Sequence, residues 1–150
     1  MEEFVFAREN GWLPTVGRED GQLLMTLIGG TGPLHDPRSF TFPIEEVHLT
    51  VIRSSLARHL LLYSALLPLA DDAGTQGPLD GEAAAGLLDR ILLADAAGVD
   101  RDLLKTRWDR RTLVAHGANL KLMQRGKVLE SLRHATATSD WGRVTKYLGR

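Results

Sequence analysis

The sequence predicts an α+β fold in which a small antiparallel β-meander of three to four strands precedes about five α-helices. Up to residue 43, short apolar stretches alternate with turn sequences, as they do in β-hairpins. From Ile44 onward, apolar residues recur at steps of three or four, which is the period of an amphipathic helix. The 150 residues fit a single domain, with a β-rich part (1–43), a helical part (44–150) and a linker near 71–79.

Turn sequences delimit the strands. Asn10-Gly11 and Asp20-Gly21 both tolerate the positive φ angles of a tight hairpin turn, so each is expected to join two antiparallel strands. The glycine-rich stretch Gly29–Pro33 then leads to a short edge strand that ends before Pro43. The strands expected from this pattern lie around 4–6, 12–16, 23–28 and 38–42.

Capping residues and glycines delimit the helices. Asp80 and Asp100 are suited to cap helix N-termini, and Gly98, Gly117 and Gly126 are suited to interrupt or end helices. Gly, Pro and polar residues between Asp71 and Pro78 break the apolar period and predict the linker. The helices expected from this pattern are 44–67, 82–94, 101–116 and 120–137, with a short last helix from Trp141.

Charge is distributed very unevenly along the chain. Residues 1–100 hold 6 Arg and Lys against 15 Asp and Glu, a net charge of −9, and residues 101–150 hold 12 against 4, a net charge of +8. The total of −1 conceals this separation. Either the two parts neutralise each other, within one chain or between two chains, or the basic part binds an acidic partner.

Two arginines interrupt an apolar helix face if residues 101–116 form one helix. The projection places Arg107 and Arg111 on the same arc as Leu103, Leu104 and Trp108. A guanidinium on such a face needs a carboxylate partner or a bound anion, because an unpaired buried charge is costly. Both interpretations stay open, and the candidate residues for binding an anion or a partner are Arg107, Trp108, Arg111, Arg110 and Lys105.

No catalytic, metal or cofactor site is assigned. Gly29–Pro33 follows an apolar strand but lacks the Lys-Ser/Thr and the helix that a phosphate-binding loop needs. His35-Asp36 forms an acid/base pair that no nucleophile accompanies. His48 and His59 would lie about 16 Å apart along one helix, too far to share a metal ion. The chain is therefore expected to have no metal or cofactor, and an enzyme is less favoured than a binding protein but stays open.

The compartment follows from composition. The chain has no cysteine, which excludes disulfides, Cys-ligated zinc and thiol nucleophiles and favours the reducing cytoplasm. The N-terminal Met-Glu-Glu-Phe has acidic residues where a signal peptide needs basic ones. The longest apolar stretch, Leu60–Ala70, is too short to span a membrane. We therefore expect a cytoplasmic protein without a membrane partner.

Several stretches resemble an uncharacterised bacterial protein family. They are Phe42–Leu49, Arg58–Leu62, Arg107–Asp109 and Leu113–Gly117. That family has no known function to transfer, so the resemblance implies only a bacterial cytoplasmic origin. The preference for Arg over Lys, 14 to 4, also suggests a bacterial origin.

The function that these observations favour is a binding or assembly module that acts through protein–protein contacts, either with itself as a homo-oligomer or with another protein. The alternative is binding of nucleic acid or an anionic ligand through the basic C-terminal helices. It is less favoured because the net charge is slightly negative and no helix-turn-helix, zinc-finger or RNA-binding motif is present. A second alternative is a small enzyme of the hydrolase type.

Overall fold

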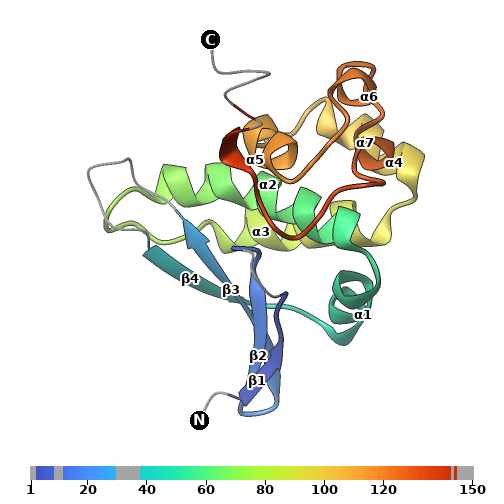
Figure 1. Ribbon diagram of the computed structural model, residues 1–150. Coiled ribbons are helices and arrows are strands. Elements are labelled where there is room, and N and C mark those ends of the chain that lie inside the picture. Colours follow the sequence, from blue (N-terminus) through green and yellow to red (C-terminus); the bar gives the residue numbers. More distant parts are fainter. Residues whose placement is uncertain (1–2, 9–11, 30–37, 143, 145–150) are drawn as a thin grey trace.

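A four-stranded antiparallel sheet begins the fold and confirms the expected meander. The computed structural model describes residues 3–8, 12–29, 38–142 and 144 (Figure 1). The strands follow each other in space in chain order: β1 (Glu3–Phe6), β2 (Thr15–Glu19), β3 (Gln22–Gly29) and β4 (Arg38–Pro43). The expected turn at Asn10-Gly11 and most of the loop after Gly29 lie outside the described residues.

The turn between β2 and β3 has the conformation that its sequence predicts. Asp20 and Gly21 have φ angles of 52° and 82°, and they separate the paired residues Glu19 and Gln22. A two-residue turn with two positive φ angles follows the twist of the flanking strands. The expected second strand begins later than its apolar residues suggest, since Trp12 precedes it and is 65% exposed.

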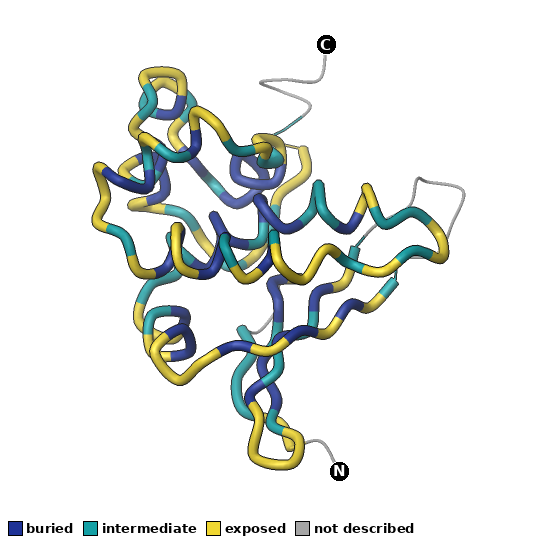
Figure 2. The backbone as a smooth tube through the Cα atoms, turned by 180° about the vertical axis from the view of Figure 1, so that it is seen from behind, coloured by how far each residue is buried: buried dark blue, intermediate teal, exposed yellow. Residues whose placement is uncertain are grey.

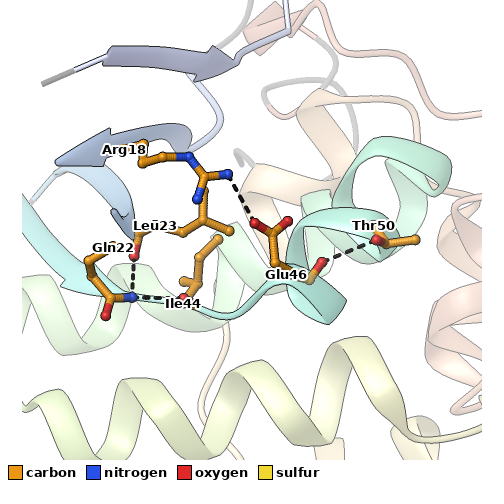
Figure 3. A network of polar contacts seen from close by, with 6 residues as sticks. All are labelled: Arg18, Gln22, Leu23, Ile44, Glu46 and Thr50. Carbon is orange, nitrogen blue, oxygen red and sulfur yellow. Dashed lines mark hydrogen bonds and ion pairs between the residues drawn. The ribbon is translucent and has the colours of Figure 1, made fainter. Parts of the chain in front are cut away.

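One face of the sheet is buried against the helices. Alternate residues of β3 and β4 point inward, as a half-buried sheet requires: Leu23, Met25, Leu27, Phe40 and Phe42. The end of the sheet near the turn between β2 and β3 also contacts the start of the helical part. Arg18 pairs with Glu46 at 2.9 Å, and the Gln22 side chain donates to the backbone oxygens of Leu23 and Ile44 (Figure 3).

The helical part has more and shorter elements than expected: seven α-helices and one π-helix up to Ser131, followed by the helical residues Trp141, Gly142 and Val144. The elements up to Ser131 are α1 (Glu46–Ser54), α2 (Leu56–Ala73), α3 (Gly81–Leu87), the π-helix η1 (Leu88–Leu93), α4 (Ala96–Leu103), α5 (Arg110–Ala115), α6 (Leu120–Gln124) and α7 (Val128–Ser131). The long helix α2 crosses the middle of the fold, with the sheet on one side and α4–α7 on the other (Figure 1). Exposed residues gather at turns such as that between β2 and β3 (Figure 2).

The expected helix 44–67 is broken at one residue. Ser55 is extended, with φ −134° and ψ 102°, and it ends α1 and begins α2. Its hydroxyl accepts a hydrogen bond from the backbone N–H of Arg58 at 3.1 Å, which caps α2. The following helix then continues to Ala73, so the connection expected near 71–79 begins only after that residue.

Arg8 joins the sheet part to this helix break. Its Nη2 donates to the Ile52 carbonyl at 2.6 Å, and its Nε donates to Nδ1 of His59 at 3.1 Å. The His59 ring is fully buried and donates from Nε2 to the Pro14 carbonyl at 2.9 Å. Burial lowers the pKa of His59 to about 4, so the ring is neutral and can accept from Arg8. The two side chains thus satisfy a carbonyl at the end of α1 and fix the chain after β1.

The expected helix 101–116 is wrong. The helix α4 ends at Leu103, and α5 begins only at Arg110, so residues 104–109 form a connection. Asp109 is the reason for the late start, because its carboxylate accepts from the backbone N–H groups of Arg111 and Thr112 at 3.0 and 3.4 Å. Arg107 and Arg111 therefore do not share a helix face.

Glycines end α5 and α6 as the sequence predicts. Gly117 and Gly126 have φ angles of 102° and 80°, and each follows the residue that caps its helix. Ala118 N–H donates to the Leu113 carbonyl and Gly117 N–H to that of Val114, which together form a Schellman motif. The expected helix 120–137 is consequently divided into α6 and α7, and α7 ends at Ser131.

We expect Gly77→Ala to destabilise the fold by about 1–3 kcal/mol, because an added Cβ would lie 2.4 Å from the Ala73 carbonyl oxygen. That oxygen is backbone and accepts the Gly77 N–H, so it cannot move aside freely. Gly81→Ala is the matched control. It has open space at the start of α3 and should stabilise by up to about 1 kcal/mol through helix propensity. Urea unfolding measures both, and equal effects would contradict the assigned contact.

Candidate binding surface

A proline inside α2 creates an attachment point for the connection 104–109. Pro68 has no backbone N–H, so the carbonyl of Ser64 loses the donor that it would have in a regular helix. The backbone N–H of Asp109 takes that place and donates to the Ser64 oxygen at 2.8 Å. Because Ser64 is fully buried, this hydrogen bond fixes the connection against the middle of α2.

Asp109 holds the connection from two directions. Its backbone bonds to α2, and its side chain caps the N-terminus of α5. The residues on both sides are therefore held in place, with Trp108 on one side and Arg110 and Arg111 on the other. This explains how a short segment between two helices presents a fixed set of side chains.

The Trp108 surface, as we name Lys105, Arg107, Trp108, Arg110 and Arg111, surrounds Pro68. Trp108 is half-buried, and its ring centroid lies 5.8 Å from the guanidinium carbon of Arg110, within the range of a cation–π contact. Two hollows of about 310 and 410 Å³ flank the ring, and both are lined by Pro68, Trp108 and Arg110. A third hollow of about 240 Å³ adjoins Lys105 and Arg107. The fold thus gathers all five predicted residues in one place.

Two of the arginines have carboxylate partners. Arg107 forms an ion pair with Asp72 near the C-terminal end of α2, and both side chains are exposed. Arg111 lies 3.8 Å from the carboxylate of Asp109. Exposed pairs of this kind contribute up to about 1 kcal/mol, so they orient the side chains more than they stabilise the fold. For Lys105 and Arg110 the described residues offer no ion-pair partner.

Carboxylates from α2 lie beside the arginines, and sequence analysis missed them. Burial raises the pKa of Asp71, and the charges of Asp109 and Asp72 raise it further, while Arg107 and Arg111 lower it. Burial, followed by the charge of Asp109, also raises the pKa of Tyr63. A proline within an apolar helix is the sequence signal that could have pointed to this part of α2.

A histidine–aspartate pair elsewhere does not form a catalytic dyad. Nε2 of the buried His48 lies 2.9 Å from Oδ1 of Asp89, which η1 contributes. Nδ1 accepts from the backbone N–H of Glu45 at 3.0 Å, so Nε2 carries the proton and donates to Asp89. Neither ring nitrogen is left to accept a proton from a substrate. The pair His35-Asp36 lies outside the described residues.

The described part of the chain has neither a metal site nor a membrane span. There, no group of three or more His, Asp or Glu side chains is placed to hold a metal ion. Over the same residues, every helix is too short or too polar to cross a membrane.

The fold is α+β, and the surface gathers an aromatic ring and four basic side chains around a proline. The chain belongs to a family of unknown function, DUF6357, whose pattern matches residues 1–150. No curated protein and no solved structure matches the chain. The resemblance to an uncharacterised family is thereby confirmed.

Proposed function

We propose that this protein is an assembly module in which the Trp108 surface of one copy binds an acidic surface of a second copy. The observation that carries the proposal is the hydrogen bond from Asp109 N–H to the Ser64 carbonyl, which holds Trp108 and its arginines in a fixed arrangement. Tryptophan and arginine are the residues that most often dominate the energy of protein interfaces. Because the backbone of this segment is already fixed, binding has to order only its side chains.

Charge supports a second copy as the partner. The net charges of −9 and +8 in the two parts nearly cancel, yet one ion pair, Arg107–Asp72, joins them among the described residues. Ion pairs among the described residues therefore do little to neutralise the charge separation within one chain. Complementary potentials of this kind accelerate association and select the partner.

The hollows beside Trp108 fit side chains of a protein partner. Each is shallow and combines the apolar Pro68 and indole ring with the guanidinium of Arg110. Such a site takes a carboxylate side chain together with the apolar residue next to it, because the guanidinium can make charge-assisted hydrogen bonds at the edge of an apolar contact. Nucleic acid would need phosphate contacts along a longer basic track.

We expect the wild-type protein to form an oligomer at low salt that dissociates toward the monomer at high salt. Arg110→Glu combined with Arg111→Glu should shift the mass toward the monomer at low salt and weaken self-association about tenfold or more, because two attractive contacts become repulsive. Light scattering coupled to gel filtration measures the molar mass. Arg107 is left unchanged because it is hydrogen-bonded to Asp72, whereas Arg111 lies 3.8 Å from the carboxylate of Asp109 and Arg110 has no ion pair with a described residue.

Arg125→Glu combined with Lys127→Glu is the matched control. It changes the net charge equally on exposed residues between α6 and α7 that do not line the Trp108 hollows. The control should keep the wild-type mass. A wild-type protein that is monomeric under all conditions would overturn the proposal. Equal effects of the two double variants would show that the Trp108 surface is not the site of self-association.

A cytoplasmic location in a bacterium is part of the proposal. The absence of cysteine and the preference for arginine support it. In a reducing compartment, an assembly held by charge and aromatic contacts needs no disulfide.

A further inference from the structure

A groove of about 630 Å³ lies between α6 and α7, apart from the Trp108 surface. Backbone hydrogen bonds tie its two walls together. Asn119 N–H donates to the Ser131 carbonyl at 2.8 Å, and Thr136 N–H donates to the His116 carbonyl at 2.8 Å. The buried His116 ring also donates from Nδ1 to the Thr136 carbonyl at 2.9 Å. These bonds fix the spacing of the walls without a ligand.

Apolar side chains line the inner part of the groove. Val114 and Ala118 are buried, and Leu122 from α6 is half-buried. The positive φ of Gly117 turns the chain sharply after α5 and brings Ala118 back against the Leu113 carbonyl. Gly117 and Ala118 therefore both lie at the groove.

Basic side chains from both walls surround the apolar surface. Lys121 comes from α6, and Arg133 and His134 come from the segment after α7. A single carboxylate, Glu130, accompanies them, and neither Lys121 nor Arg133 forms an ion pair with another described residue. Two cations against one carboxylate leave the groove with a net positive charge, which attracts anions.

We infer that this groove binds a small carboxylic acid with an apolar body. The carboxylate lies between Lys121 and Arg133, whose guanidinium presents two parallel N–H donors to its oxygens, and the His134 ring supplies a further polar contact. The apolar body packs mainly on Leu122, because Val114 and Ala118 are almost fully buried. The volume is in the range of small-molecule sites, and the groove offers both apolar and polar surface to such a ligand.

Octanoate is the probe, and isothermal titration calorimetry of the full chain measures its binding. We expect octanoate to bind, and acetate and 1-octanol to bind at least about tenfold more weakly, because one lacks the apolar body and the other lacks the charge. Arg133→Gln and Lys121→Gln should each weaken octanoate binding about tenfold. Arg125→Gln, at an exposed position outside the groove, should leave binding unchanged.

Circular dichroism verifies that each variant is folded before titration. The absence of octanoate binding, equal binding of octanoate and 1-octanol, or unchanged binding in Arg133→Gln would overturn the inference. The double variant Arg110→Glu/Arg111→Glu should still bind octanoate, because neither residue lines the groove. Failure of the assembly proposal and failure of this one are therefore distinguishable.

Discussion

Lowering the pH from about 7 to about 4 is expected to reduce the free energy of unfolding by about 3 kcal/mol through His59 alone. The folded-state pKa of this residue is about 4, against 6.5 for the unfolded chain. Between these values the unfolded chain binds a proton that the folded chain does not. The stability present above pH 6.5 is therefore lost as the pH falls through the folded-state pKa.

Structure gives the physical reason for this shift. Protonation would place a charge in a fully buried ring and a proton on Nδ1, which accepts from Arg8 Nε. The positive charge of Arg8 also lowers the pKa of His59, in addition to burial. Acidification therefore weakens the hydrogen bond between Arg8 and His59, which joins the chain after β1 to α2.

Urea unfolding at several pH values, with wild type and His59→Gln, measures the effect. The variant removes the titrating ring while keeping an amide donor, so its stability should be lower at pH 7 but depend less on pH. Burial also lowers the pKa of His116. The stability of the His59→Gln variant should therefore still decrease somewhat as the pH falls. Asp71 acts weakly in the opposite direction, because its pKa is raised and it is exposed.

His134→Gln is the control for this experiment. The residue is exposed, so its substitution removes a histidine without changing the buried core. An equally steep dependence in wild type and His59→Gln would show that other groups cause the acid sensitivity.

The sheet was predictable because its signals are local. The Asp20-Gly21 turn and the alternation of buried residues in β3 each depend on a few neighbouring residues. The glycine signals are also local, but they were only partly correct: Gly117 and Gly126 end their helices as predicted, whereas Gly98 lies inside α4. The helix break at Ser55 was not predictable from period, because Ile52, Leu56 and Leu60 keep the same spacing across it.

The Trp108 surface was predicted from a helix that does not exist. Projection placed Arg107 and Arg111 on one face, whereas the fold gathers them through the connection that Asp109 fixes to Ser64. This hydrogen bond joins residues far apart in the sequence and depends on Pro68, so no local pattern predicts it. Sequence identified these side chains as unusual, and tertiary contacts determine where they lie.

Leu66→Ala is expected to destabilise the fold by about 3–4 kcal/mol, because Leu66 is fully buried and the truncation leaves a cavity. Its helix, α2, contacts β3 and the helices α1, α3, α5 and α7, so close-packed neighbours on several sides cannot all relax into the space. An ordinary domain has about 5–15 kcal/mol of stability, so this single change removes a large share of it. Urea unfolding measures the loss.

Leu69→Ala makes the same change three residues further along α2, where the side chain is half-buried, and it should cost less than about half as much. The comparison removes the contribution of helix propensity, since both substitutions place alanine in the same helix. Equal losses at the two positions would contradict the central place of α2. A larger loss at Leu66 would support the view that apolar packing around α2 holds the fold together, because among the described residues a single ion pair, Arg107–Asp72, joins residues 1–100 to residues 101–150.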